Sequence, residues 1–421
     1  MSLGVARVNG QQEQREPLPE EEWNRRTFLL ELARSLPAGV IETMATTFAV
    51  FLAVSVFQAS QLEKAFLVAS SSIGLLLSLF VVQWVRKLGC SVNQAIGAVS
   101  LLAAVGFSVA AIFPHSLACY LGGMMMAKMG VMLGVPLFSQ IYRKCFPSES
   151  RGQLFAIAAI LRKVAAIVAA LFFGFWLKEH PNDFPSLLAL YAVSCVAMVV
   201  CVAAMKPVRL RRNVGAVNLF SAFGHVKRDR AFRRVLTSWM ILGLGNLICL
   251  HIFVDTVSNP RFGLALDVAQ VSLITTIAPE ICYLLTVFLW GRIFDRVNFF
   301  AVRIMINLFF IVGILVFFLG GQIWTLYLGM GLHGIGKAGG NIAWSLWVTK
   351  FAEEDQVAEY MSVHTFFTGC RSLAAPFIGF SVAGAFSPQV VGILGATLIT
   401  VSTVMILPML LENRTKRLVR G

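Results

Sequence analysis

Two apolar stretches decide the fold of this chain: LACYLGGMMMAKMGVMLGVPLFSQI at residues 117–141 and LYLGMGLHGIGKAGGNIAWSLWVTK at residues 326–350. A bilayer-spanning helix needs about 20 apolar residues, and both stretches are long enough. Each carries a lysine near its middle, Lys128 in the first and Lys337 in the second. The two lysines are 209 residues apart, which is the first sign of a duplicated unit.

The same spacing recurs in two other places. Arg162 and Arg371, each within the next apolar segment, are also 209 residues apart. So are residues 82–89 and 291–298, which precede the third apolar segment of each half. We infer that the two halves repeat one unit, and that each copy keeps cations at matching depth.

Composition sets the class of protein. Hydrophobic residues make up 57% of the chain and charged residues 13%, about half the charged share of a soluble protein. A soluble domain could not bury that much apolar surface, so an integral membrane protein is predicted. The eight cysteines lack CxxC spacing and are interpreted as packing residues. We therefore expect no metal site and no cofactor.

Twelve segments are long and apolar enough to span a bilayer. They are residues 27–58, 64–86, 93–113, 116–142, 151–178 and 186–206, then 232–258, 267–292, 298–320, 322–351, 356–382 and 387–411. Helices are predicted throughout, because a backbone inside lipid must satisfy its own hydrogen bonds. The predicted organisation is a tail (1–26), a six-helix bundle (27–206), a basic linker (207–231), a second bundle (232–411) and a tail (412–421).

Charge placement predicts the orientation. Most of the 35 Lys and Arg residues fall on the side that holds both termini, whereas the other side receives Lys64, Lys178 and Arg261. Positively charged loops stay in the cytoplasm, so both termini are predicted to be cytoplasmic. We expect a multi-pass protein of the cell membrane, either plasma or inner, that acts as a monomer.

Three charged residues lie near the ends of predicted segments. The first segment is longer than a bilayer requires, and its opening turns carry Glu31 and Arg34. We expect these turns to protrude from the membrane. Asp255 is close to the outer end of the seventh segment, where we expect it to be solvated.

The linker region at residues 206–234 is strongly basic. Phe220, Phe223 and Val226 share one face of a possible helix, with basic residues opposite. This pattern fits a helix that lies on anionic lipid, and it fits equally well a solvated linker that obeys the charge rule. Because topology accounts for the pI of about 9.7, no nucleic-acid partner is expected.

The loop after the eighth segment reads Gly291-Arg-Ile-Phe-Asp295-Arg296. With twelve spans in two repeats and a basic central loop, the chain resembles the major facilitator superfamily of secondary transporters, which carries Gly, Asp and Arg at this spacing. The resemblance implies that Asp295 faces the N-terminus of the eleventh helix, whose dipole favours an anion, and helps to hold one of two conformations. The first-half copy keeps only Gly89 of this pattern.

Charged residues within the spans carry the functional prediction. Five cations and two acids lie there: Lys128, Arg162, Lys163, Lys337 and Arg371, with Glu42 and Glu280. Each charge at mid-membrane costs on the order of 2.5–3.5 kcal/mol on insertion scales. A surplus of three positive charges is not expected to face lipid, so most of these groups should line a watery cavity or pair with one another.

An anion-binding site is one interpretation of these cations. The resemblance implies that helices four and ten, which carry Lys128 and Lys337, surround a central cavity, and that helices five and eleven, with Arg162 and Arg371, complete it. Arginine offers a forked donor to carboxylate or phosphate, and lysine a point charge. Asn341, one turn past Lys337, could also donate to a substrate. The alternative is that these cations are structural and pair with acids or backbone carbonyls.

Glu42 and Glu280 are the candidates for proton coupling. A carboxyl group at mid-membrane beside a cation can change its protonation when a substrate arrives. The alternative is a permanent salt bridge. His251, His333 and His364 could also titrate near neutral pH, although a lone histidine in a helix is more often a packed residue.

The sequence therefore predicts a secondary transporter of a small anionic solute, such as a carboxylate or phosphate ester, that works by alternating access with proton coupling or exchange. Its expected partners are that solute, the lipid bilayer and, if the cycle is a symport, protons. Enzymatic activity is not predicted: residues 331–337 match G-x-x-x-x-G-K, but Ala338 follows where a phosphate loop needs Ser or Thr.

Two alternatives remain open. One is proton-driven efflux of amphipathic drugs or lipids. The superfamily's drug antiporters usually carry a Gly-Pro-rich motif in helix five, and residues 155–175 here contain one glycine and no proline. The other is a scaffold with a transporter-like fold that moves nothing. Such a scaffold would have no reason to bear the cost of the intramembrane cations.

Overall fold

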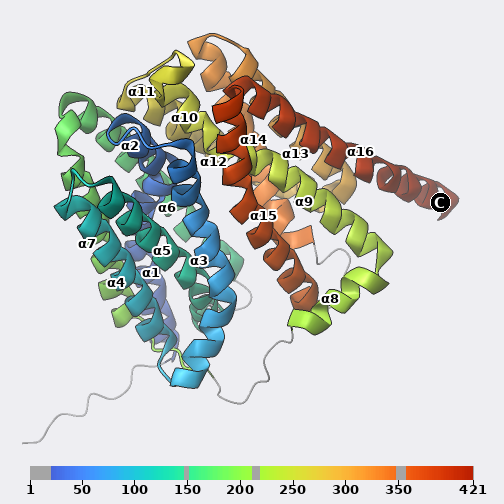
Figure 1. Ribbon diagram of the computed structural model, residues 1–421. Helices are drawn as coiled ribbons and strands as arrows, with labels where there is room; N and C mark the ends of the chain where they lie inside the picture. Colours follow the sequence, from blue (N-terminus) through green and yellow to red (C-terminus); the bar gives the residue numbers. More distant parts are fainter. Residues whose placement is uncertain (1–19, 147–150, 211–218, 348–356, 421) are drawn as a thin grey trace, which may run out of the picture.

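The computed structural model describes residues 20–146, 151–210, 219–347 and 357–420. Within these ranges the chain is helical and contains no strand. Figure 1 shows two bundles side by side, with the first half of the chain in one and the second half in the other. The predicted all-α membrane fold with two pseudo-symmetric bundles is confirmed, while the residue bounds of the two domains stay a prediction.

The first bundle begins with α1 (Glu20–Thr43), a π-helical segment η1 (Met44–Phe48) and α2 (Ala49–Ser55), which together form one span. The helices that follow are α3 (Gln61–Leu88), α4 (Val92–Ile112), α5 (Leu117–Cys145), α6 (Arg151–Glu179), η2 (Pro181–Asp183) and α7 (Phe184–Ala204). Local sequence fixes two of the starts: Ser60 with Glu63 forms a capping box on α3, and Ser91 with Gln94 forms one on α4.

The second bundle follows the short linker helix α8 (Leu219–Arg228). Its elements are α9 (Arg230–Leu250), α10 (Ile252–Ser258), η3 (Pro260–Phe262), α11 (Val268–Ser272), the π-helical η4 (Leu273–Ile277), α12 (Ala278–Arg296), α13 (Phe299–Leu319), α14 (Ile323–Leu346), α15 (Val357–Ala385) and α16 (Pro388–Arg420). Ten helical spans among the described residues are long and apolar enough to cross a membrane. The other two predicted spans correspond to α3 and α14, of 28 and 24 residues.

Packing within the two bundles repeats. In the first, α4 packs against α5 and α7, and α1 packs against α6 and α7. In the second, α13 packs against α14 and α16, and α9 packs against α15 and α16. The contact of α3 with α5 is matched by that of α12 with α14. This correspondence is what the 209-residue repeat predicts.

The bundles meet along two seams, α3 against α15 and α6 against α11 and η4. Several of these contacts lie toward the end of the molecule remote from the start of α1. Phe66 and Phe377 meet edge to face at 5.1 Å, and Ser272 Oγ donates to the carbonyl of Ala170 at 2.8 Å. The two halves are therefore joined at this end, which we call the outer end because it lies opposite the termini.

Asp255 lies inside the outer end, so the expectation that water solvates it is wrong. Its carboxylate is fully buried and accepts from Lys64 Nζ at 2.7 Å, across the two bundles. Asn259 Nδ2 donates to the same oxygen at 3.1 Å. The bundle contact covers the position that a helix end would otherwise expose, and Lys64 balances the charge.

Glu31 and Arg34 lie in the opening turns of the first span, and the protrusion of these turns from the membrane stays a prediction. Both side chains are buried in the first bundle, because α1 extends back to Glu20 and packs against α6 and α7. Arg34 Nε donates to Glu31 Oε2 at 2.7 Å, and its guanidinium lies 4.1 Å from the Phe138 ring. The tyrosine hydroxyl of Tyr142 completes the group. The two opposite charges therefore neutralise each other within the bundle.

The linker helix α8 packs against the second bundle through an aromatic contact. The Phe223 ring meets Phe366 at 5.3 Å and Phe367 at 5.7 Å, both edge to face. Phe223 therefore packs against α15 and does not support the predicted contact of this helix with lipid. The side chain of Phe220 lies outside the described residues.

Candidate functional site

A cavity of about 340 Å³ lies between the two bundles. Its walls come from η1, α3 and α5 in the first half and from α9, α10, η4, α12, α14 and α15 in the second. The titratable side chains among its lining residues are Lys128, His251, Glu280, His333 and Lys337. The volume is at the lower end of the roughly 300–1,000 Å³ of small-molecule sites.

Lys128 extends from α5 into this cavity. Its side chain is 5% exposed, and it has no ion pair or hydrogen bond within the described part of the chain. A buried charge without a partner carries a desolvation penalty of several kcal/mol. An anion in the cavity would offset that penalty.

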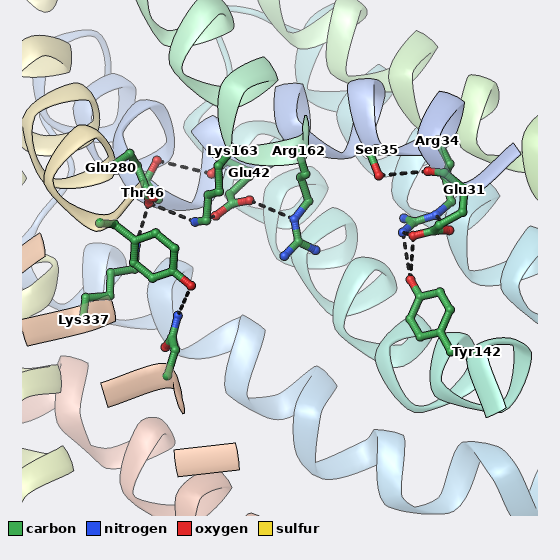
Figure 2. Close-up of polar contacts among 12 residues, drawn as sticks. Glu31, Arg34, Ser35, Glu42, Thr46, Tyr142, Arg162, Lys163, Glu280 and Lys337 are labelled. Atoms are coloured by element: carbon green, nitrogen blue, oxygen red, sulfur yellow. Dashed lines mark hydrogen bonds and ion pairs between the residues drawn. The ribbon is translucent and has the colours of Figure 1, made fainter. Parts of the chain in front are cut away.

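Lys337 is held in a network of charges, which Figure 2 shows running from α14 to α6. Lys337 Nζ lies 2.6 Å from Glu280 Oε1, and the same oxygen accepts from Lys163 Nζ at 3.0 Å. Lys163 also pairs with Glu42, whose other oxygen is 3.4 Å from Arg162 Nε. Three cations thus share two acids, and Lys163 links the first bundle to the second.

The two π-helical segments touch beside this network. Thr47 of η1 shares a hydrogen bond of 2.9 Å with Thr275 of η4, and it also contacts Thr276. Glu42 lies just before η1, and Glu280 lies just after η4. π-helical turns are rare and often occur at functional sites. The two acids of the network therefore flank the only two π-helical segments among the described residues.

The four repeated cations differ in where they lie. Lys128 and Lys337 both line the cavity. Arg162 is not among the lining residues and turns toward Glu42. Arg371 is not among them either: its Nη1 donates to the backbone carbonyl of Trp239 within the second bundle. The substrate-binding roles of all four stay predictions, with the two lysines placed to act together.

The remaining predicted residues lie outside the cavity lining. Asn341 Nδ2 donates to the hydroxyl of Tyr283 at 3.3 Å, at an exposed position. In the loop motif, Gly291 is partly exposed and Arg296 is exposed at the end of α12. The side chain of Asp295 lies outside the described residues. The hydrogen-bonding role of Asn341 and the conformational role of the loop motif stay predictions.

The three histidines separate into two groups. His251 and His333 line the cavity, and His333 Nε2 lies 2.8 Å from Asn246 Oδ1. His364 is buried elsewhere in the second bundle, among tryptophan rings that include Trp347 at 5.2 Å. Sequence pattern does not predict this division, because all three histidines lie in apolar segments.

Sequence reasoning missed two charged residues. Lys163 is one of the five cations of the spans but is not among the predicted substrate-binding residues, yet it bridges Glu42 and Glu280. Arg303 is not among the predicted cations of the spans, yet it is 1% exposed inside α13. A count of acids within the spans against every nearby cation would have drawn attention to Lys163. Arg303 offers no such signal, because it is only a few residues inside the predicted span.

Comparisons with known proteins agree with this geometry. The model of the Major Facilitator Superfamily matches residues 256–420. The chain is similar in structure to a variant of the nucleoside transporter NupG, with a TM-score of 0.74, 15% identity, and coverage of 92% of this chain and 99% of that one. No curated protein matches the chain.

Two further structures extend the likeness over nearly the whole chain. A POT family transporter in complex with a thioalcohol-conjugated peptide gives a TM-score of 0.67 at 12% identity, covering 93% and 96% of the two chains. The human organic anion transporter MFSD10 (TETRAN) gives 0.61 at 14% identity, covering 93% and 100%. The fold is thus the same in each case, while the sequences have diverged.

The chain is a multi-pass helical membrane protein with the fold that these solved transporters share. The resemblance predicted from the sequence agrees with both comparisons: the model of the Major Facilitator Superfamily matches the second half of the chain, and nearly the whole chain has the fold of the transporters to which it is similar.

Proposed function

We propose that this protein carries a small organic anion across the membrane by alternating access, and that the anion docks at Lys128. The observation that carries the proposal is the buried Lys128 ammonium, which has no partner in the described residues and extends into the cavity between the bundles. Charge-assisted hydrogen bonds to an ammonium are about twice as strong as neutral ones. A bound carboxylate or phosphate ester would supply that contact.

The lining of the cavity favours a ligand with one negative charge and an apolar body. Lys128 and Lys337 contribute two positive charges, and Glu280 contributes one negative charge, so the charged lining carries a net charge of +1. Much of the remaining wall is apolar and includes Leu247, Leu250, Phe253, Val254 and Met330. A monoanion would neutralise the lining while its hydrocarbon part packs against these side chains.

Coupling would act through Glu280. Protonation of this carboxyl would weaken its contacts with Lys337 and with Lys163, the second of which joins the two bundles. A proton could thereby change the link between the halves, as symport requires. In an exchange cycle, one anion would take the place of the other at Lys128. Both cycles use the same residues, with Glu42 holding Lys163 on its own side.

We assign both termini to the cytoplasm, as the charge distribution predicts. The bundles are joined at the outer end by Lys64 and Asp255, so the state described here would face inward. Opening to the outside would require that pair to separate. Alternating access needs two such states, each closed at one end.

Transport assays on the purified protein in vesicles test the proposal. Labelled monocarboxylates, phosphate monoesters, a neutral nucleoside and an amphipathic cation would be compared for uptake. We expect a monoanion to be taken up, and Lys128→Gln to reduce that uptake by about 30-fold or more, since truncating one partner of a buried charge contact costs about 2–5 kcal/mol. Lys128→Arg keeps the charge and serves as the matched variant.

Equal uptake by wild type and Lys128→Gln would contradict docking at Lys128. Transport of the amphipathic cation alone would favour drug efflux over anion transport. The absence of any flux, from a protein that is folded by its thermal unfolding curve, would favour the scaffold alternative.

A further inference from the structure

A second group of cations lies inside the second bundle, around Trp239 of α9. The guanidinium of Arg303, from α13, lies 3.4 Å from the Trp239 ring. Arg371, from α15, donates through Nη1 to the carbonyl of the same residue. His364 of α15 is fully buried, with its ring 5.9 Å from that of Trp239. None of these side chains lines the central cavity.

Several polar atoms of this group lack hydrogen-bond partners. In the described part of the chain, Nη1 and Nη2 of Arg303, Nε of Arg371, Nε1 of Trp239 and both ring nitrogens of His364 are buried and unpaired. No acid among the described residues forms an ion pair with either arginine. A buried charge that lacks both an opposite charge and hydrogen bonds costs several kcal/mol. The guanidinium groups and the indole of this cluster therefore present hydrogen-bond donors that have no acceptor in the described part of the chain.

In the first bundle, a buried arginine is neutralised by an acid. There Arg34 of α1 pairs with Glu31, and Figure 2 shows this pair apart from the Lys337–Arg162 network. Adding the repeat distance of 209 residues to these positions gives Gly243 and Met240 in α9. The equivalence is supported by the starts of α1 and α9, at Glu20 and Arg230, which are 210 residues apart.

A guanidinium occupies the corresponding place in the second bundle, but its acid is missing from the sequence. Gly243 lies against the guanidinium of Arg371, since a Cβ at position 243 would be 2.1 Å from the arginine Cζ. Glycine thus makes room for a guanidinium that arrives from α15 instead of from the same helix. The position of the acid is taken by Met240, whose sulfur lies 4.0 Å from Arg371 Nη1. A thioether is a weak acceptor and carries no charge.

We propose that Arg303 and Arg371 bind a small inorganic anion of the halide class inside the second bundle. This anion would supply the negative charge that Glu31 supplies in the first bundle. The ligand is small because Arg303 is 1% exposed and His364 is fully buried, which leaves no path for a bulky solute. It is an acceptor without donors, because the unpaired atoms of both arginines and of Trp239 are donors.

The expected role of the anion is to hold α9, α13 and α15 together. Each of these helices contributes one of the donors, and binding would remove the repulsion between the two arginines. Ligands that bind only the folded state raise its stability by mass action. The proposal does not depend on transport at Lys128, so either can fail while the other holds.

Thermal unfolding of the purified full-length protein tests the proposal, with sodium chloride titrated against sodium gluconate at constant ionic strength. We expect chloride to raise the Tm by a few degrees and to saturate. Met240→Glu places a carboxylate where the first bundle has Glu31, so its Tm in gluconate should match or exceed that of wild type in chloride. Chloride should then have no further effect. Met240→Gln keeps the size without the charge and should retain the chloride response.

A wild-type Tm that is the same in chloride and gluconate would overturn the proposal, as would a Met240→Glu protein that keeps the full chloride response. If Met240→Glu does not fold, the Arg303→Gln variant tests the proposed anion site instead. It removes two of the unpaired donors, and the chloride concentration at half saturation should rise at least tenfold. If the chloride concentration at half saturation is unchanged in Arg303→Gln, the proposed anion site at Arg303 and Arg371 is wrong.

Discussion

Lys128 and Lys337 occupy matching positions in the two halves and line the same cavity, yet their surroundings differ. Lys337 pairs with Glu280 at 2.6 Å, whereas Lys128 has no partner among the described residues. The residue 209 positions before Glu280 is Ser71, which also lines the cavity. A single acid, present in one copy and replaced by a hydroxyl in the other, separates the two lysines.

The difference suggests how a repeated unit can take on two tasks. The charge of Lys128 is available to a ligand, whereas Lys337 belongs to the network of ion pairs that joins the bundles. Glu31 and Met240 show the reverse arrangement. Here the first half has the acid, and the second half has a methionine in its place. In both comparisons a guanidinium or ammonium is present in each half, whereas its acid is present in only one.

Glu280→Gln should have the largest effect, because it removes the acid that distinguishes the lysines. Two cations would lose a buried partner, and breaking a buried pair typically costs about 3–5 kcal/mol. We expect a clearly lower Tm than that of Glu179→Gln, a matched change at an exposed position at the end of α6. Lys337 should then behave like Lys128, so that dianions compete better for the site. An unchanged Tm and unchanged anion preference would show that the network contributes little.

Ser71→Glu tests the comparison from the other side. If Ser71 is the counterpart of Glu280, the new carboxylate should pair with Lys128 and occupy the place of the substrate anion. We expect binding of the transported anion to weaken by about 2–4 kcal/mol, or roughly 30- to 700-fold in Kd. The control is Ser71→Gln, which has similar size and no charge. Comparable loss in both variants would mean that bulk, rather than charge, blocks the site.

Tyr283→Phe should have the smallest effect. The change removes the hydroxyl that accepts from Asn341, and it keeps the ring that lies 5.5 Å from Lys163 Nζ. A neutral hydrogen bond contributes about 0.5–1.5 kcal/mol, and this one is exposed. We expect a change in substrate Kd of about tenfold at most. A much larger loss would place Asn341 and Tyr283 among the main determinants of binding.

The sequence predicted the features that depend on local pattern. Apolar length gave the helical spans, and the 209-residue spacing gave the two-bundle repeat and the paired lysines of the cavity. It misplaced Asp255, because this residue lies near a span end, where burial depends on neighbouring helices. It could not find the Lys163 bridge, since which face of α6 meets α12 depends on how the bundles dock.

The amino-acid sequence alone determined that this protein is a two-fold repeated helical membrane protein with more basic than acidic groups in its spans. Apolar length, charge count and repeat spacing are properties of a chain before it packs. Only the tertiary structure decided which of those charges neutralise one another. Ion pairs form over a few ångströms between helices that are far apart in sequence, so Glu280 meets Lys337 while Lys128 is left to the cavity in the described part of the chain.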